Sequence, residues 1–386
     1  MKSTLVAGLL VAGLLAAAAL TGCGTGSDDD TAEQEVEVPF STAEWATDFS
    51  TNSVPLDEFV GGGPPKDGIP SIDVPKFVGV DEAEEFLDGS EPVAVVELEG
   101  EIRAYPLQIL IWHEIVNDEI AGEPVAVTYC PLCNSTVAFR REVDGRPVEF
   151  GTTGMLRNSD LVMYDRATES WWQQITAEAV VGEQTGTKLE VLPSQILAWD
   201  QFQRLHPGGR VLSRETGFDR NYGSNPYTGY DSDPDSQPFL LEGEADPSLP
   251  PKERVAAIQT GDGSAVVYPF SRLADEAPIN DEIDGRLVAV FFDPNVASAL
   301  DSSAISAGRD VGAAAVFERL AGARTLDFEA GPDQGTFRDV QTASTWTMSG
   351  EATAGPLKGT QLEQLPHDDQ FWFALAAFFD DADIRG

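Results

Sequence analysis

Residues 117–133 read NDEIAGEPVAVTYCPLC, and residues 280–296 read NDEIDGRLVAVFFDPNV. The two segments align without a gap at an offset of 163 residues, and further matches follow along the chain at offsets of 178, 174 and 173. Because collinear matches over such a distance do not arise by chance, the sequence predicts an internal duplication. We assign residues 79–207 to a first repeat, 255–386 to a degenerate second repeat, and 208–254 to a connector.

Each repeat has the residue pattern of several strands and two helices. In the first repeat, apolar runs bounded by turn residues predict strands, and Asp144-Gly145 predicts a tight hairpin turn. Pro106 opens a run with helical spacing over 107–116, and a second helix is predicted over 195–205. The sequence thus predicts a strand-dominated α+β fold of two tandem homologous domains that pack together, with the choice between barrel and sandwich left open.

The N-terminus has the pattern of a lipoprotein signal. Residues 1–22 combine Lys2 with an apolar run that is shorter than a membrane span, which is typical of a signal peptide. Residues 20–23, LTGC, resemble the bacterial lipobox, in which the cysteine is lipidated and becomes the mature N-terminus. Residues 23–78 have the composition of a flexible tether followed by an irregular lead-in. We therefore expect an extracytoplasmic protein that a lipid on Cys23 anchors to the cell membrane.

The chain is strongly acidic, with 24 Lys and Arg against 65 Asp and Glu and a formal charge of −41. Binding to nucleic acid requires a basic surface, so this composition argues that nucleic acid is not a partner. A large net charge serves solubility, or suits a salty medium that screens the repulsion between like charges. The sequence leaves these two explanations open.

The two repeats act as controls for each other. Residues kept in both copies serve the shared fold, whereas residues special to one copy are candidates for chemistry. Cys130, Cys133 and His113 belong to the second kind. At the offset of 163 they align with residues that offer neither sulfur nor a ring nitrogen: Asp293, Val296 and Glu276. The groups most able to bind a soft metal or to perform thiol chemistry are thus absent together from the second repeat.

Cys130 and Cys133 allow three interpretations. A Cys-x-x-Cys pair is a known redox spacing, in which the pKa values of the thiols control the chemistry. Two thiolates together with His113 would instead hold a soft metal ion, copper or zinc. A structural disulfide is the third interpretation, although closing a loop of four residues contributes only about 2 kcal/mol. We favour the redox interpretation, with Cys130, Cys133 and His113 as the catalytic residues.

A longer segment in the first repeat is expected to border this site. The stretch from Phe150 to Asp165 is four residues longer than its counterpart in the second repeat, and the additional residues fall at 154–160. We predict ligand-binding roles for four side chains in this region: Arg157, Asn158, Asp160 and Tyr164. A salt bridge between Arg157 and Asp160 at the surface is the alternative explanation for this pair.

The connector contains one further motif. Residues 231–242 nearly fit a calcium-binding loop, but Ser236 replaces the turn glycine and two prolines interrupt the pattern. In a chain this acidic such a match arises easily, so whether this stretch binds calcium is left open. Residues 208–254 are also too long for an ordinary connection, which indicates either a functional loop or a flexible one.

Five specific motifs stand in the first repeat and the connector. They are YPL, WHEIVND and VTYCPLC within residues 105–133, NSDLVMYD at 158–165 and NPY at 225–227. These motifs resemble the bacterial and archaeal family called domain of unknown function 3179. The resemblance covers residues 93–231 and, more weakly, the second repeat. It implies no activity, because the family has no agreed one.

The combined prediction is a surface lipoprotein whose first repeat performs thiol–disulfide chemistry on an unknown protein or small-molecule redox partner. Binding or delivery of copper or zinc is the first alternative, and a non-catalytic ligand-binding lipoprotein with a structural disulfide is the second. We expect residues 117–119 to reverse the chain and to bring the ring of His113 within about 8 Å of the sulfurs, as a hydrogen bond or a shared metal requires. Asn117 persists as Asn280 and is expected to be structural.

Overall fold

The computed structural model describes residues 38–385, and strands dominate them, so the predicted strand-rich α+β class is confirmed. The predicted signal peptide and Cys23 lie outside these residues. The helices are short: α1 (Val80–Ala83), α2 (Leu107–His113), α3 (Trp199–Leu205), α4 (Phe270–Glu276), α5 (Trp372–Ala376), and the 3-10 helices η1 (Leu56–Glu58) and η2 (Ile305–Ala307).

The first half of the described chain forms three sheets. One has the order β15 (Ser194–Ala198), β3 (Pro92–Leu98), β4 (Glu101–Pro106), β16 (Arg210–Leu212) and β2 (Phe77–Gly79). The second has the order β14 (Glu190–Leu192), β7 (Ser135–Arg140), β6 (Glu123–Cys130) and β5 (Ile115–Ile120). The third has the order β1 (Phe59–Gly61), β10 (Phe150–Arg157), β11 (Asp160–Asp165), β12 (Trp171–Gln173) and β13 (Glu178–Val181). A small hairpin pairs β8 (Glu142–Val143) with β9 (Arg146–Pro147).

The second half forms three sheets in the same order. The first contains β28 (Asp368–Phe371), β17 (Arg254–Gln259), β18 (Ala265–Pro269) and β29 (Asp383–Ile384). The second contains β19 (Ile279–Ile283), β20 (Arg286–Asp293) and β21 (Ala313–Glu318). The third contains β24 (Phe328–Ala330), β25 (Thr336–Asp339), β26 (Thr345–Thr347) and β27 (Ala352–Ala354), beside a hairpin of β22 (Leu320–Ala321) and β23 (Arg324–Thr325). Each half also has one parallel pair, β16 with β4 and β29 with β18.

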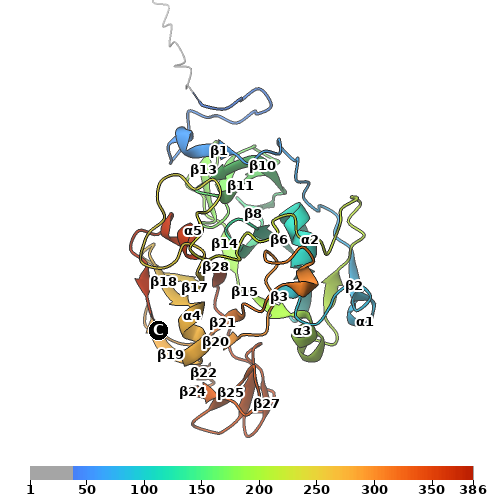
Figure 1. Cartoon of the computed structure of the whole chain (residues 1–386), viewed down its shortest axis with the longest axis vertical. Helices are drawn as coiled ribbons and strands as arrows, with labels where there is room; N and C mark the ends of the chain where they lie inside the picture. The colour runs from blue at the N-terminus through green and yellow to red at the C-terminus, as the bar shows by residue number, and fades with distance from the viewer. Residues whose placement is uncertain (1–37, 386) are drawn as a thin grey trace, which may run out of the picture. The chain divides into compact units, whose positions relative to one another are not determined.

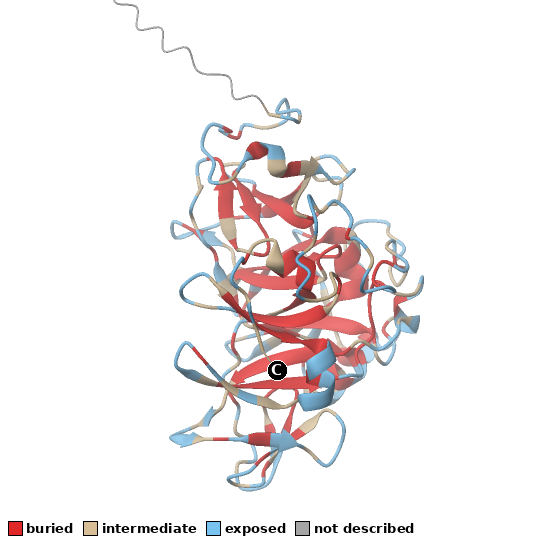
Figure 2. Cartoon of the chain, turned by 60° about the vertical axis from the view of Figure 1, so that its left-hand side comes forward, coloured by how far each residue is buried: buried red, intermediate tan, exposed pale blue. Residues whose placement is uncertain are grey.

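The two halves share hydrophobic cores. One core cluster joins Val93 and Trp199 of the first half to Phe291 and Trp346 of the second half. In Figure 1 the sheet of β10 and β11 and the sheet of β24 and β25 lie at opposite ends, with β28 and β15 between them. Figure 2 shows buried residues along the strands between these ends. Because burying this apolar surface requires both halves together, residues 38–385 belong to one compact unit.

The hairpin that leads to the cysteines differs from the expected one. The chain reverses at Ala121 and Gly122, whose φ angles are 54° and 85°, and not at residues 117–119, which lie inside β5. Asn117 donates from Nδ2 to the carbonyl of Phe150 at 2.8 Å and accepts from the amide of Phe150 at 2.9 Å. These bonds tie β5 to β10, so the expected structural role of Asn117 is confirmed.

Two predicted helices are shorter than expected. The helix expected at 107–116 ends at His113, because Glu114 has a φ of 58° and starts the turn into β5. The helix expected at 195–205 begins only at Trp199. Its first part is strand β15, which pairs with β3 from residue 194 to residue 198. Tertiary pairing overrides the helical spacing of this run, as it commonly does for short apolar segments.

The two halves differ most in the loop between corresponding strands. Residues 131–134 connect β6 to β7, whereas residues 294–312 connect β20 to β21. This longer loop accounts for the change of offset from 163 to 178. Within it, Leu300 and Ile305 are fully buried in the same core cluster as Cys130. The second half therefore inserts a loop into the core around the cysteines.

Candidate functional site

The two cysteines occupy the end of β6 and the turn that follows it. Cys130 is the last residue of β6 and pairs with Ser135 of β7. The turn is held from outside by β28 of the second half: the amide of Phe371 donates to the carbonyl of Cys133 at 2.9 Å, and Asn134 Nδ2 donates to the carbonyl of Asp369 at 3.1 Å. The backbone around the thiols is thus fixed by both halves of the chain.

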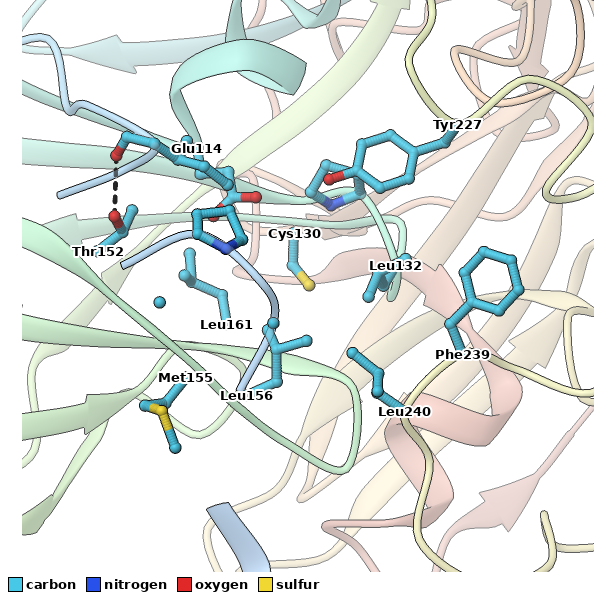
Figure 3. Close-up of a pocket in the computed structure, with 15 residues that line it drawn as sticks. Glu114, Cys130, Leu132, Thr152, Met155, Leu156, Leu161, Tyr227, Phe239 and Leu240 are labelled. Atoms are coloured by element: carbon cyan, nitrogen blue, oxygen red, sulfur yellow. Dashed lines mark hydrogen bonds between the residues drawn. The ribbon is translucent and has the colours of Figure 1, made fainter. Parts of the chain in front are cut away.

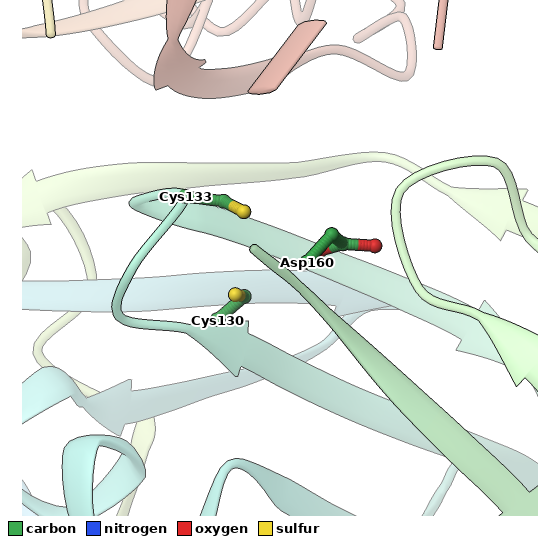
Figure 4. Close-up of side chains that lie close together, drawn as sticks. All are labelled: Cys130, Cys133 and Asp160. Atoms are coloured by element: carbon green, nitrogen blue, oxygen red, sulfur yellow. The ribbon is translucent and has the colours of Figure 1, made fainter. Parts of the chain in front are cut away.

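Both thiols are free and buried, and one carboxyl group lies beside them. Cys130 is 2% exposed and Cys133 is fully buried. Sulfur atoms of Cys130 and Cys133 and a carboxylate oxygen of Asp160 all lie within 4.8 Å of one another. Figure 4 shows the two cysteines on one hairpin and Asp160 entering from β11. Among residues 38–385 this is the one group of three such side chains with that spacing.

Asp160 is buried with half of its carboxylate unsatisfied. Its Oδ2 accepts hydrogen bonds from Gln173 Nε2 at 2.6 Å and from the amide of Ile175 at 3.1 Å. Its Oδ1 is buried and has no hydrogen-bond partner. Burial raises the pKa of Asp160 to about 6, although these hydrogen bonds and one from Cys133 act in the opposite direction. At neutral pH the group is therefore an ionised carboxylate that can accept a proton or bind a cation.

The two thiols differ in their surroundings. Burial raises the pKa of Cys130, while a hydrogen bond from the Cys133 thiol partly offsets this effect. Burial raises the pKa of Cys133 well above its ordinary value, and the hydrogen bonds of its thiol add to the shift. Of the two, Cys130 is the sulfur whose thiolate is stabilised by its neighbour.

A cavity of about 400 Å³ opens onto Cys130. Cys133 and Asp160 do not line it, so they lie behind Cys130 as seen from the cavity. Figure 3 shows Glu114 and Tyr227 on one side of Cys130 and Leu156 and Leu240 on the opposite side. The remaining lining is mostly apolar: Gly62, Pro64, Ile69, Pro131, Leu132, Thr152, Gly154, Met155, Leu161 and Phe239. The cavity thus presents one thiol sulfur to a small apolar space.

Glu114 is a site residue that the sequence did not identify. Its carbonyl accepts from the amide of Tyr129 at 2.8 Å, which holds Glu114 beside the end of β6. Burial, followed by the charge of Asp160, raises the pKa of Glu114 to about 8, so the group is mostly protonated at neutral pH. The positive φ of Glu114 is a costly conformation for a residue other than glycine, and such strain often occurs at functional sites. The sequence did contain one signal for Glu114, because the second repeat has Ala277 at the matching position.

His113 is not part of the cysteine cluster. Its Nδ1 donates to the carbonyl of Pro70 at 2.7 Å, and its Nε2 accepts from the hydroxyl of Tyr222 at 2.7 Å. Burial lowers the pKa of His113 to about 4, which keeps the ring neutral and suits this arrangement of donor and acceptor. The expected place of His113 beside the sulfurs is instead taken by Asp160. The reason is local: α2 ends at His113, and the chain turns so that the next residue, Glu114, faces the cavity.

Two of the four predicted ligand-binding residues, Arg157 and Tyr164, have structural partners, and a third, Asn158, lies in a turn. Arg157 forms an ion pair with Glu58 at 2.6 Å, not with Asp160. Tyr164 donates from its hydroxyl to Asp67 at 2.6 Å. Asn158 has a φ of 50° in the turn between β10 and β11. The longer segment nevertheless borders the site, because it carries Asp160 and places the carbonyl of Ser159 3.6 Å from the Cys130 sulfur.

The acidic stretch 231–242 offers little to calcium. Asp231 accepts from Arg254 at 2.6 Å, from Ser298 at 2.7 Å and from Arg309 at 3.3 Å. Two arginines thus already neutralise Asp231, the first carboxylate of this stretch. The same bonds fasten the connector to the second half. The connector in turn supplies Tyr227, Phe239 and Leu240 to the cavity wall.

Comparison with known proteins agrees with the motifs. The model of a family described as Protein of unknown function (DUF3179) matches residues 66–382, and the chain belongs to this family. No match is found among curated proteins, and none among solved structures. Within residues 38–385, no helix has the length and apolarity needed to cross a membrane.

Proposed function

We propose that the chain is a thiol–disulfide oxidoreductase in which Cys130 and Cys133 are the reacting pair and Asp160 accepts the proton of Cys133. The observation that carries this proposal is the asymmetry of the pair: Cys130 lines the cavity, while Cys133 lies behind it against a buried carboxylate. A dithiol exchange needs one sulfur that meets the substrate and a second that resolves the mixed disulfide. The site supplies both.

The geometry assigns a role to each group. Cys130 is the attacking sulfur, since it alone of the two faces the cavity and receives a hydrogen bond from the other thiol. Cys133 then attacks the mixed disulfide on Cys130, for which its thiol has to lose a proton. Asp160, with a pKa of about 6, is ionised at neutral pH, and one of its carboxylate oxygens lies within 4.8 Å of that sulfur. It can therefore act as a general base without any metal or cofactor.

Trapping the intermediate tests these roles. Reduced protein is treated with one equivalent of a small disulfide, and its mass is followed over time. Cys133→Ser should accumulate a mixed disulfide on Cys130, because the resolving thiol is missing. The Cys130→Ser variant should form a mixed disulfide much more slowly, since its remaining thiol, Cys133, does not face the cavity. A stable adduct on Cys133 in the Cys130→Ser variant, formed as fast as on Cys130, would reverse the assignment.

Binding of a soft metal ion is the second candidate. The unpartnered Oδ1 of Asp160 supports it, because a buried carboxylate oxygen without a partner is costly and a cation would remove that cost. Zinc bonds of about 2.0–2.3 Å require ligand atoms roughly 3.3–3.8 Å apart, which small side-chain rotations would achieve from a spacing within 4.8 Å. The ligand set would be Cys130, Cys133 and Asp160, with copper or zinc as the ion and His113 excluded.

Metal analysis separates the two candidates. If the protein purified without oxygen carries two titratable thiols and no bound metal, the redox proposal is supported. One equivalent of zinc or copper that protects both thiols from alkylation, and that Asp160→Asn weakens, would favour the metal site. Asp293→Asn is the matched control, because Asp293 occupies the position of Cys130 in the second half and lies at the end of β20.

We also propose that the two halves arose by duplication and that the second half lost the chemistry. Matching hydrogen bonds support this: Tyr105 donates to Asp118 and Tyr268 donates to Asp281, both at 2.6 Å. The indole nitrogens of Trp172 and Trp346 likewise each donate to an aspartate at 3.0 Å. An experimental structure in which the two halves do not superpose over these residues would contradict the proposal.

Finally, we propose that the protein is an extracytoplasmic lipoprotein, tethered through a lipid on Cys23 to the cell membrane. The support is the sequence of residues 1–23 alone. Mass spectrometry of the mature protein should find a diacylglycerol-modified Cys23 as the first residue. Cys23→Ala should leave the precursor uncleaved at this position. A mature wild-type chain without lipid would refute the proposal.

A further inference from the structure

The wall of the cavity beside Cys130 lacks positive charge. No Lys, Arg or His is among the described residues that line it, and its one carboxyl group is Glu114. The rest of the wall consists of aliphatic, glycine and aromatic residues with the hydroxyl groups of Thr152 and Tyr227. A wall of this composition solvates apolar groups and offers an anion no counter-ion.

This composition acts against anionic thiol compounds. Moving a carboxylate from water into an apolar site without a partner costs several kcal/mol or more. The formal charge of −41 adds repulsion over a longer range, which salt screens only in part. Neutral molecules incur neither cost.

The cavity also limits the size of what can reach the sulfur. Its volume of about 400 Å³ lies near the lower end of the usual range for small-molecule sites. Cys130 is 2% exposed, so a disulfide held in a folded protein cannot approach it along the surface. The substrate has to enter the cavity.

We propose that the substrate of the Cys130–Cys133 pair is a small, neutral and largely apolar disulfide that binds in this cavity. The inference rests on the thiol–disulfide function proposed above and adds the class of substrate. It follows from the apolar lining, the absence of cations from the wall and the burial of Cys130.

The reaction is balanced with the groups present. The Cys130 sulfur attacks one sulfur of the substrate RS–SR, the S–S bond breaks, and the released RS⁻ takes up the proton that Cys130 gave up. Cys133 passes its proton to Asp160 and attacks the Cys130 sulfur, which releases the second RS⁻ to be protonated. One disulfide is reduced to two thiols by two electrons, and the protein is left with a Cys130–Cys133 disulfide.

Phe239 and Leu240 of the connector form the outer wall of the cavity. They line it and yet are 59% and 43% exposed, so they separate it from solvent. Large apolar side chains at the mouth would favour entry of an apolar molecule. A charge introduced here should change which disulfide reacts while leaving the buried thiols in place.

Single-turnover kinetics with the full-length reduced protein test the inference. Dipropyl disulfide is the neutral apolar probe, and oxidised glutathione is the anionic one. The second-order rate constant of each disulfide with the protein is first divided by the rate constant of the same disulfide with a small free thiol. We expect this normalised value for dipropyl disulfide to exceed that for oxidised glutathione by at least tenfold. A smaller ratio would overturn the substrate class.

A pair of variants ties the preference to the cavity. Leu240→Lys places a cation in the wall and should raise the rate with oxidised glutathione at least threefold while lowering that with dipropyl disulfide. Leu320→Lys is the matched control, since Leu320 is 42% exposed in β22 and does not line the cavity. Equal effects of the two substitutions would show a general charge effect and overturn the assignment to this cavity.

The outcomes also distinguish the two proposals. If oxidised glutathione reacts with the pair as fast as dipropyl disulfide or faster, the oxidoreductase function stands and the apolar substrate class is wrong. If the reduced protein, with both thiols titratable, reduces neither compound, the oxidoreductase function fails and the substrate class fails with it.

Discussion

The hairpin of β6 and β7 and the hairpin of β20 and β21 are built on matching strands, but their ends differ. In the first, the short turn 131–134 keeps Cys130 and Cys133 together, with Cys130 in the wall of the cavity and Cys133 behind it. In the second, β20 ends in Asp293, and the long loop 294–312 packs into the core of the first half. Matching pairs of strands thus carry a short turn with two buried thiols in one half and a loop that packs into the core in the other.

This difference teaches that the second half supports the structure around the cysteines. Its loop holds the connector through two hydrogen bonds. The amide of Tyr230 donates to the carbonyl of Leu300 at 3.2 Å, and the amide of Gly229 donates to the carbonyl of Asp301 at 2.7 Å. The connector then covers the cavity through Tyr227. The loop of the second half thus supports the cavity of the first half through the connector.

The largest expected effect comes from the carboxylate that only the first half has. Asp160→Asn should slow resolution of the mixed disulfide on Cys130 by about 10²-fold, because Cys133 loses its proton acceptor. The first step, attack by Cys130, should change much less. Rapid-quench mass spectrometry measures both steps. Asp293→Asn in the second half should leave both rates within about twofold, and an Asp160→Asn variant that resolves at the wild-type rate would rule out the general-base role.

The second effect concerns stability and pH. The pKa of Glu114 is raised from 4.5 to about 8, so the folded protein holds a proton that the unfolded chain releases between these values. Stability from this group is complete below pH 4.5 and is lost as pH rises through about 8. Glu114→Gln should therefore stabilise the protein at pH 9 by roughly 1–3 kcal/mol and flatten the fall of Tm with pH.

Thermal unfolding between pH 5 and 9 measures this effect. Glu276→Gln is the control, since this exposed residue ends α4 at the position that matches His113. It should leave the pH profile unchanged. If the Glu114→Gln variant is less stable than the wild type at pH 9, the ionised carboxylate must have a partner. Its interaction with that partner would then stabilise the folded protein by more than the free energy lost by desolvating the carboxylate.

The third effect is the pH dependence of alkylation. Burial raises the pKa of Cys130 from its ordinary value of 9.0, so its thiolate continues to increase above that pH. The rate of reaction with iodoacetamide should rise by about tenfold per pH unit beyond pH 9, where the rate of a free thiol levels off. Peptide mapping after timed quenching gives the rate at Cys130. A plateau below pH 8 would show a thiolate stabilised by a group that the site does not contain.

The smallest effect compares two asparagines that make matching hydrogen bonds to a backbone, although Asn117 also donates to Asp73 Oδ1 at 2.7 Å. Asn117 bridges β5 to Phe150, and Asn280 bridges β19 to Phe328 with bonds of 2.8 Å in both directions. Asn117 is 2% exposed whereas Asn280 is exposed, so water can replace only the second set of bonds. Asn117→Ala should cost about 2–3 kcal/mol and Asn280→Ala about 0.5–1 kcal/mol. Chemical denaturation measures both, and equal losses would contradict this account.

Parts of the fold were predictable because they follow from local residue patterns. The hairpin turn at Asp144-Gly145 and the start of α2 after Pro106 are set by backbone preferences of single residues. The strand β15 was not predictable, since residues 194–198 have helical spacing and become a strand only by pairing with β3. The early end of α2 was missed for a related reason, namely that a buried Glu114 adopts a left-handed backbone that its residue type does not favour.

The candidate site was predictable in part. Comparison of the two repeats singled out Cys130 and Cys133, and the greater length of residues 150–165 in the first repeat indicated Asp160. The same comparison selected His113 because the second repeat has a different residue at the matching position. Two repeats also differ at a position where the side chain makes a structural contact that exists in only one of them. The bonds of His113 to Pro70 and Tyr222 are such contacts with the lead-in and the connector.

The sequence by itself determined the family and the strand-rich class and singled out the cysteine pair as the candidate site, because these are carried by motifs and by differences between two aligned segments of one chain. Only the tertiary structure decided which polar groups meet the sulfurs. Asp160, Glu114 and Tyr227 come from separate parts of the chain and converge on Cys130 through sheet pairing and burial. Their proton affinities depend on that burial, which residue order alone does not specify.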